Sequence, residues 1–277
     1  MSDKEKMGII GAGNMGEAIA AGLQEDAEQL IDLIVFDIDN VKLEEVAVNY
    51  NLETADSLEA LVVNSDYLLF AVKPDIVEQV AKQVTEYIEG WPEAEKINGV
   101  ISIAAGVRTK YLRRFLPEEV GIVRVMPNTP LRVGEGISFL AMESEDRRPE
   151  LLNLAKEIFS AVGRVEVVAE DKMNAVTALS GSGPAYVFYF LEALKEAGVY
   201  LGLEAETAEV AALQTLMGAG KLAEESEEDF YALRAAVSSP GGTTVEALKH
   251  LEENGLKGKL QEAVKKAASR AGELEQQ

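Results

Sequence analysis

The sequence contains no cysteine and only one histidine among its 277 residues. Without cysteine there can be no disulfide, no thiol nucleophile and no thiolate metal site, and a single histidine rules out a multi-histidine metal cluster. We therefore expect any reaction carried out by this chain to proceed without a bound metal.

Long apolar runs are missing as well. No stretch approaches the ~18 consecutive apolar residues that a membrane-spanning helix requires. The first six residues, MSDKEK, are polar and lead directly into a predicted strand, which leaves no room for a signal peptide. We expect a cytoplasmic protein with no membrane partner.

Basic side chains are scarce, with 26 Lys and Arg against 48 Asp and Glu, so the formal net charge is −22. Such a field repels nucleic acids and anionic lipid surfaces, and neither is an expected partner. The acidity has two interpretations, a solvated surface that maintains solubility or an adaptation to salty or hot surroundings, and the sequence leaves both open.

The patterns that are present indicate two domains, for which 277 residues give ample length. In the first part of the chain, short apolar runs without alternation are separated by segments of helical spacing, as in strands buried on both faces of a parallel sheet. We predict that residues 1–167 form a mostly parallel α/β sheet of the Rossmann type with helices on both faces. The expected strands are 7–10, 33–37, 67–72, 99–104, 121–126 and 136–141, and the expected helices are 17–23, 41–50, 75–87, 109–115 and 150–162.

Strand-like runs disappear in the second part, where Ala/Leu/Glu-rich segments follow one another. We predict that residues 168–277 form an all-helical domain with helices at 184–201, 204–224, 228–237, 243–253 and 256–274. The segment Ala205–Met217 is apolar around most of its circumference. Such a helix is either buried centrally or packed on a second subunit.

A glycine fingerprint of the form Gly-x-Gly-x-x-Gly follows the first predicted strand. Gly11 permits a sharp turn, Gly13 lets the backbone approach a pyrophosphate, and Gly16 packs the following helix against the strand. Asn14 and Met15 stand at the start of that helix, whose N-terminus would face the phosphates. The motif predicts dinucleotide binding, although three glycines at this spacing also arise by chance.

Asp37 ends the second predicted strand, 21 positions after Gly16. This is where a carboxylate would meet the adenosine ribose hydroxyls, although Asp37 could instead cap the loop or helix that follows. The neighbouring residues 38–40 supply no arginine to balance a 2′-phosphate. The sequence therefore favours NADH over NADPH.

Other candidate cofactor residues follow later strands, because ligands of open α/β sheets bind at the carboxyl edge. Lys73 could approach a phosphate or ribose, or be a solvated lysine, and Asn128 could bond a cofactor or hold its own proline-flanked turn. The candidates in these segments are Ala71, Val72, Lys73, Pro74, Ala104, Ala105 and Asn128.

Two glycine- and hydroxyl-rich segments precede helices in the second domain. The segment 180–186, with Ser182, offers a place for close backbone approach. In the segment 239–244, glycines and hydroxyls open an amphipathic helix, so the free N–H groups and the positive end of the helix dipole could bind a small carboxylate. Simple N-capping by Ser239, Thr243 or Thr244 is the alternative.

Five segments together carry a resemblance to a known family: Gly11–Gly16, Ala71–Pro74, Met126–Pro130, Ser180–Tyr186 and Ser239–Thr244. The sequence resembles pyrroline-5-carboxylate reductase over nearly its whole length. The resemblance implies NAD(P)H-dependent reduction of 1-pyrroline-5-carboxylate to L-proline, the last step of proline biosynthesis. It also implies a Rossmann domain followed by a helical dimerisation domain, in homodimers that often assemble into larger rings.

The resemblance also implies roles for residues of the second domain. Ser239, Gly242 and Thr243 would hold the substrate carboxylate, with Ser182 and Gly241 in the same substrate-binding set. The hydroxyl of Thr244 would face the ring nitrogen as the catalytic group. Many family members carry basic or small polar residues after the second strand and favour NADPH, so Asp37 is a departure from the pattern.

Two alternative functions compete with this interpretation. A β-hydroxyacid dehydrogenase would share both domains. The pattern of that family has a catalytic lysine at the position where this sequence has Val187. A non-catalytic dinucleotide sensor needs only the Rossmann half, and leaves the segment Ser239–Thr244 without a purpose. Hydride transfer to an imine needs neither cysteine, metal nor histidine, which agrees with the composition.

Overall fold

The computed structural model describes residues 4–26, 30–90, 97–143 and 148–275. The chain divides into two compact units, the first made of Met1–Gly181 and Ala267–Gln277 and the second of Ser182–Lys266. Residues 168–181 and 267–277 thus group with the sheet, and the domain boundary after residue 167 stays a prediction. Of the polar start of the chain, residues 1–3 lie outside the described residues.

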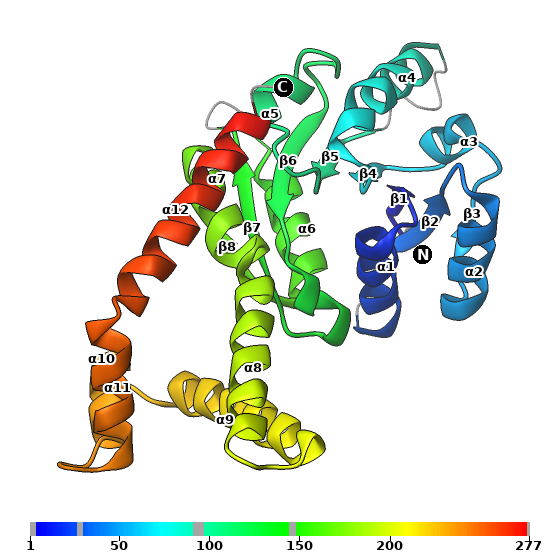
Figure 1. Cartoon of the computed structure of the whole chain (residues 1–277). Coiled ribbons are helices and arrows are strands. Elements are labelled where there is room, and N and C mark those ends of the chain that lie inside the picture. Colours follow the sequence, from blue (N-terminus) through cyan, green and yellow to red (C-terminus); the bar gives the residue numbers. More distant parts are fainter. Residues whose placement is uncertain (1–3, 27–29, 91–96, 144–147, 276–277) are drawn as a thin grey trace. The chain divides into compact units, whose positions relative to one another are not determined.

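The first unit is built on one sheet of strands in the order β3-β2-β1-β4-β5-β6-β7-β8. All neighbouring strands are parallel except β6 and β7, which are antiparallel. The strands are β1 (Lys6–Ile10), β2 (Asp32–Phe36), β3 (Glu53–Thr54), β4 (Tyr67–Phe70), β5 (Gly99–Ser102), β6 (Gly121–Met126), β7 (Gly136–Met142) and β8 (Gly163–Val167). The predicted Rossmann-type, mostly parallel sheet is confirmed (Figure 1).

Helices cover both faces of this sheet, so its strands bury side chains on both sides. Buried side chains of Ile9, Val35 and Leu69 pack with α1 (Asn14–Asp26), α2 (Asn40–Tyr50) and α6 (Pro149–Ser160). On the opposite face, residues such as Ile10 and Phe70 pack with α3 (Leu58–Val63), α4 (Val77–Gly90) and α5 (Thr109–Leu112). Continuous apolar strands are therefore explained by burial on both faces.

Short elements account for the differences from the sequence-based expectations. The strands β3 and β8 and the helix α3 were not expected, and the predicted helix 75–87 is split into a 3₁₀ turn, η1 (Pro74–Ile76), and α4. The strand β8 lies at the edge of the sheet and is largely exposed. Its alternating sequence GRVEV lacks the apolar run that marks the inner strands.

The second unit is entirely helical, as predicted. It contains α8 (Gly183–Tyr200), α9 (Ala205–Glu225), α10 (Phe230–Ala236), α11 (Thr243–Glu253) and the first part of α12 (Leu256–Leu274). Ahead of them, η4 (Glu170–Lys172), α7 (Met173–Val176) and a π-helix (Thr177–Gly181) belong to the first unit. None of the helices in the described ranges is long and apolar enough to cross a membrane.

Candidate active site

The strand order reverses its direction between β1 and β4. The chain runs outward from β1 through β2 to β3 and then crosses to β4 on the other side of β1. The carboxyl ends of the three strands are level there, since Ile10 of β1 pairs with both Phe36 of β2 and Phe70 of β4. In open α/β sheets, such a switch point is where ligands bind.

A hollow of about 640 Å³ lies at this switch point. Its size is within the range of small-molecule sites in proteins. Its walls come from the glycine loop, from the residues after β2 and β4, from the first turn of α2, from η1 and from the first two turns of α4. The predicted cofactor residues that line it are Gly11, Gly13, Asp37, Ala71, Val72 and Lys73.

The glycine loop has the geometry that its fingerprint predicts. Gly11 adopts φ +108°, which favours glycine, and a Cβ on Gly16 would lie 2.0 Å from the carbonyl oxygen of Gly11. A Cβ on Gly13, by contrast, would meet no described atom within 4 Å. Packing within the chain therefore explains why Gly11 and Gly16 are glycines. At Gly13 the space beside the backbone is open, so a ligand can approach the backbone closely there.

The carboxylate of Asp37 is held at the edge of the hollow by two backbone groups. Its Oδ2 accepts a hydrogen bond of 2.7 Å from the N–H of Ala12, and its Oδ1 accepts one of 2.8 Å from the N–H of Asp39. The helix α2 is capped by Asp39, whose side chain accepts from Val41 and Lys42. Asp37 is thus tied to the glycine loop and also caps the short loop that follows it, whereas the helix α2 itself is capped by Asp39. The contact of Asp37 with a ribose stays a prediction.

The remaining candidates of the glycine loop lie in the first turn of α1. Asn14 begins that helix and is exposed, whereas Met15 is half-buried against the core. Gly16 is buried beneath the loop. These residues shape the start of the helix and are absent from the lining of the 640 Å³ hollow.

A second hollow, of about 790 Å³, also lies in the first unit. It is lined by Pro74 and Ala105 of the predicted cofactor set, together with residues of α4, α5 and the C-terminal segment. Ala104 is buried beside them. The loop after β5 therefore presents Ala105, and not Ala104, to open space.

Asn128 is engaged within the fold. Its Oδ1 accepts a hydrogen bond of 2.9 Å from the N–H of Ile137, and its Nδ2 donates a long one of 3.5 Å to the carbonyl of Ser180. The side chain is nearly buried. The amide thus connects the loop after β6 to β7 and to the carbonyl of Ser180, and among the described residues it makes no hydrogen bond within its own turn. Its contact with a cofactor stays a prediction.

Sequence reasoning missed several residues that line the 640 Å³ hollow. Ile38 is 91% exposed, Lys42 extends from the first turn of α2, and Ile76, Gln79 and Gln83 come from η1 and α4. Gln79 and Gln83 are spaced by one helical turn, a polar pair on a helix that buries its other side, and this spacing was the available signal. Lys42 lies two positions beyond residues 38–40, the segment in which an arginine is missing.

The loop before α11 leaves the first turn of that helix without a side-chain cap. Gly242 is the N-cap residue, and among the described side chains none accepts a hydrogen bond from the cap position. Gly241 adopts φ +72°, and the N–H of Gly242 donates to the carbonyl of Ser239 at 2.9 Å. Simple capping by Ser239, Thr243 or Thr244 is therefore wrong for this structure, whereas free N–H groups at the helix start fit an anion.

The remaining predicted substrate residues lie in the second unit. Ser239, Gly241 and Thr243 are exposed, and Thr244 is half-buried in the first turn of α11. Ser182 precedes α8 and is half-buried, with its carbonyl accepting from the N–H of Ala185 at 3.1 Å. Within the described ranges, no group of three or more His, Asp or Glu side chains could hold a metal ion.

A Rossmann-type sheet with a glycine loop and a hollow at its switch point is the architecture of dinucleotide-binding proteins, and comparisons with known proteins place this chain among the oxidoreductases. Residues 6–106 match the family model for "NADP oxidoreductase coenzyme F420-dependent", and residues 170–274 match the model for pyrroline-5-carboxylate reductase dimerisation. The chain belongs to the pyrroline-5-carboxylate reductase family, which confirms the resemblance stated from the sequence.

The relatives match almost end to end. The chain is 39% identical to pyrroline-5-carboxylate reductase of Synechocystis sp., over 97% of this chain and 98% of the relative, and 36% identical to that of Escherichia coli, over 98% of both. Among solved structures, the Coxiella burnetii reductase superposes with a TM-score of 0.88 at 36% identity, covering 98% and 99% of the two chains. The Plasmodium falciparum enzyme, solved with NADP bound, gives a TM-score of 0.82 at 30% identity and covers 99% of each.

Proposed function

We propose that this chain catalyses the NAD(P)H-dependent reduction of 1-pyrroline-5-carboxylate to L-proline, the last step of proline biosynthesis. The observation that carries the proposal is the loop Ser239–Gly242, which leaves the N-terminus of α11 without a side-chain cap. A carboxylate bound there would accept hydrogen bonds from the free N–H groups and be stabilised by the helix dipole. A dinucleotide sensor needs no such site.

The first unit supplies a site that fits the cofactor. The open side of Gly13 accommodates a pyrophosphate close to the backbone, next to the N-terminus of α1. The fixed carboxylate of Asp37 can accept hydrogen bonds from ribose hydroxyls, and Ile38 offers an apolar surface for a flat ring. The full proposed set is Gly11, Gly13, Asn14, Met15, Gly16, Asp37, Ala71, Val72, Lys73, Pro74, Ala104, Ala105 and Asn128.

When bound, the nicotinamide supplies the hydride that is added to the imine carbon. The role of the protein is to bind and orient. Ser239, Gly241, Gly242 and Thr243 hold the substrate carboxylate, and Ser182 completes the substrate site. Thr244 directs its hydroxyl to the ring nitrogen.

We further propose that NADH is the preferred cofactor, with NADPH as the alternative. Asp37 and Asp39 both line the 640 Å³ hollow, and Lys42 opposes them there. A 2′-phosphate placed beside two carboxylates would meet more repulsion than one ammonium group offsets. The arginine-free segment after β2 supports the same preference.

Self-association follows from the match to the dimerisation model, and we propose a homodimer that assembles into a larger ring. Exposed apolar side chains on α8 and α9 support it, since single-chain packing leaves Phe188, Val210, Leu213 and Met217 facing outward. We assign residues 1–167 to the nucleotide-binding domain, residues 168–277 to the dimerisation and substrate domain, and the protein to the cytoplasm.

The experiment measures initial rates with 1-pyrroline-5-carboxylate and either NADH or NADPH. We expect wild-type kcat/KM to be about tenfold higher with NADH than with NADPH. The repulsion between the 2′-phosphate and the two carboxylates should cost on the order of 1.4 kcal/mol, which corresponds to that factor. The variant Asp37→Asn keeps an acceptor for the Ala12 N–H and should raise kcat/KM for NADPH. The variant Lys42→Ala should lower kcat/KM for NADPH below that of the wild type and leave kcat/KM for NADH unchanged.

The outcomes separate the alternatives. Folded protein that binds NADH but turns over neither substrate would indicate a sensor, and turnover of a 3-oxo acid alone would indicate a β-hydroxyacid dehydrogenase. The latter is already disfavoured, since Val187 stands where that family resemblance requires a lysine. A preference of the wild type for NADPH would overturn the cofactor proposal and leave the reaction intact.

A further inference from the structure

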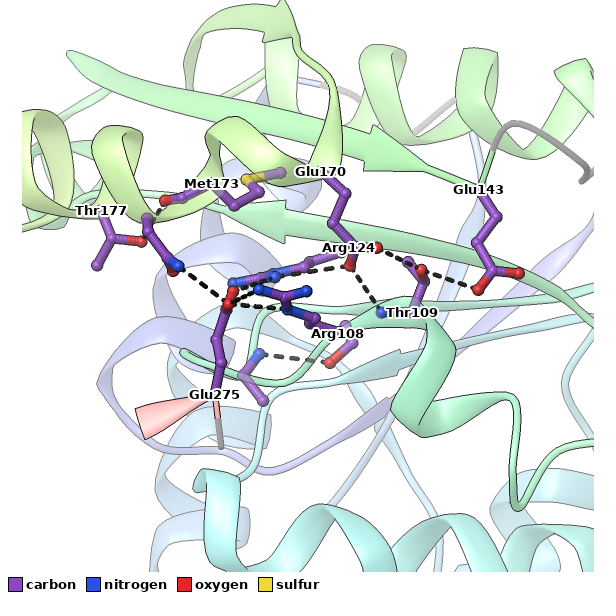
Figure 2. Close-up of polar contacts among 11 residues, drawn as sticks. Arg108, Thr109, Arg124, Glu143, Glu170, Met173, Thr177 and Glu275 are labelled. Atoms are coloured by element: carbon purple, nitrogen blue, oxygen red, sulfur yellow. Dashed lines mark hydrogen bonds and ion pairs between the residues drawn. The ribbon is translucent and has the colours of Figure 1, made fainter. Parts of the chain in front are cut away.

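A buried ion cluster lies in the first unit, outside the 640 Å³ hollow, around Glu275 (Figure 2). The side chain of Glu275 is 2% exposed. Its Oε2 accepts from Arg108 Nε at 2.8 Å, from Arg108 Nη2, and from Asn174 Nδ2 at 2.9 Å. Its Oε1 accepts from Arg124 Nη1 at 2.9 Å. One carboxylate thus joins the residue before α5, the strand β6 and the helix α7.

The contact between Glu275 and Arg124 matters for the strand β6, because it places a negative charge beside the buried guanidinium of that strand. Arg124 is 1% exposed, and its Nη1 reaches a second carboxylate oxygen, Glu170 Oε1, only at 3.5 Å. Its Nη2 has no hydrogen-bond partner among the described atoms. Glu275 is therefore the main partner of a buried cation. Burial acts to raise the pKa of Glu275, but hydrogen bonds from Arg108, Asn174 and Arg124 outweigh it and hold that pKa below its usual range.

The residue before Glu275, Leu274, touches the loop that follows β5, residues 103–108. Gly106 in this loop adopts φ +77°, and a Cβ placed on it would lie 3.3 Å from the Cβ of Leu274. The loop begins with a sheet hydrogen bond of 3.1 Å from Ile103 N–H to the carbonyl of Phe70. It ends at Arg108, which Glu275 holds through two donor atoms.

The neighbouring residue provides the second anchor of this loop. Thr109 donates from its N–H and from its hydroxyl to the two oxygens of Glu170, both at 2.8 Å. The hydroxyl also lies 3.3 Å from Glu143. Between the sheet and these anchors lie Ala104 and Ala105. Among the described residues, the one side chain that bonds to either of them is that of Ser102, whose Oγ accepts from the Ala104 N–H at 3.4 Å. Inside the loop, the N–H of Val107 donates to the carbonyl of Ala104 at 3.3 Å. The shape of the loop therefore depends on this turn and on how its far end is held.

We propose that Glu275 is a positioning residue for the cofactor. It fixes Arg108, and Leu274 packs on Gly106, so that the loop 103–108 is held in the shape that presents Ala105 to the dinucleotide. This inference rests on the proposed function. Glu275 acts through Arg108 and does not touch the reacting atoms.

The test compares steady-state kinetics of Glu275→Gln and Arg108→Gln with the wild type. Each variant should raise KM for NADH about 3- to 10-fold, the effect of losing a charge-assisted hydrogen bond, with kcat at saturation within about twofold. Because both changes break the same contact, the double variant should raise KM no further than the larger single change. Hydrogen exchange of residues 103–108 should be faster in the variants.

Glu273→Gln is the matched control, since this carboxylate lies two residues before Glu275 in the last turn of α12, is 60% exposed and pairs with the exposed Arg270. Its KM should equal that of the wild type. Arg108→Gln guards against failure to fold, because the Arg108 side chain is 53% exposed and its loss leaves no buried cation behind.

A lower melting temperature with unchanged KM and unchanged exchange of the loop would overturn the positioning role. Additive effects of the two substitutions on KM would overturn it as well. Failure of the proposed function looks different, since the wild type itself would then show no turnover of 1-pyrroline-5-carboxylate.

Discussion

At the scale of single residues, Thr244 carries the most specific expectation. It lies in the first turn of α11, half-buried, directly after the N-cap Gly242 and Thr243. Its hydroxyl can donate to or accept from a ring nitrogen, although it is too weak an acid to supply a full proton. The proton must therefore come from solvent or substrate, and the contribution of Thr244 is orientation and charge stabilisation.

We accordingly predict that Thr244→Ala lowers kcat with 1-pyrroline-5-carboxylate by about 10- to 100-fold, while KM for NADH stays unchanged. Thr244→Ser, which keeps the hydroxyl, should recover most of the rate. Steady-state kinetics of the two variants make the comparison. Wild-type turnover by the alanine variant would remove the assignment.

Residues differ in how far the sequence reveals them. Gly11 and Gly16 were predictable because their roles depend on neighbours within one turn or one strand, and Asp37 because its spacing from the fingerprint is fixed by the fold. Glu275 was not, since 167 positions separate it from Arg108 and no local pattern marks that pair. Lys42 lies between these cases, since it follows the segment 38–40 by two positions in the first turn of α2.

At the scale of elements, α9 resolves an ambiguity that periodicity left open. The expectation was a helix either buried centrally or packed on a second subunit. Ala208 and Ala212 are buried, whereas Val210, Leu213 and Met217 are exposed along one stripe. The fully buried side chains of α9 are thus small, whereas larger apolar side chains of the helix remain exposed in the single chain, which favours the second interpretation.

We predict that Leu213→Glu shifts the protein from dimer to monomer, because a desolvated carboxylate in an apolar contact costs more than a single residue contributes to the interface. Light scattering coupled to size exclusion measures the mass. Thr215→Glu adds the same charge about 200° around the helix and should leave the dimer intact. Equal masses for Leu213→Glu and the wild type would contradict the prediction.

Elements also show where sequence patterns lose force. Inner strands such as β1 and β6 were found within about one residue, because burial on both faces leaves a continuous apolar run. The edge strands β3 and β8 were missed, since β3 has two residues and β8 alternates polar and apolar side chains. The π-helix Thr177–Gly181 has no simple sequence pattern, and its last residues, 180 and 181, were predicted only to allow close backbone approach.

At the scale of the whole molecule, the charge of −22 has a measurable consequence. Most of the described ion pairs are exposed, and such pairs contribute little, so the self-repulsion of the acidic surface is the larger effect. Salt screens this repulsion over a distance of about 10 Å at 0.1 M and about 3 Å at 1 M.

We therefore predict that the melting temperature rises by about 3–5 °C when potassium chloride increases from about 0.05 M to about 1 M at constant pH. Thermal unfolding followed by circular dichroism gives the value. Potassium chloride is preferred over sulfate, which strengthens apolar burial by itself. A melting temperature that falls with salt would show that the ion pairs outweigh the repulsion.

The path of α12 affects how the protein is made. This helix begins in the second unit and ends in the first, so residues 267–277 complete a unit that began with β1. During translation the ribosome releases the sheet, then all of residues 182–266, and only then the carboxylate that pairs with Arg124. A nascent chain therefore carries a buried cation without its main counter-ion until synthesis has passed residue 275, and cofactor binding should lag behind the folding of the sheet.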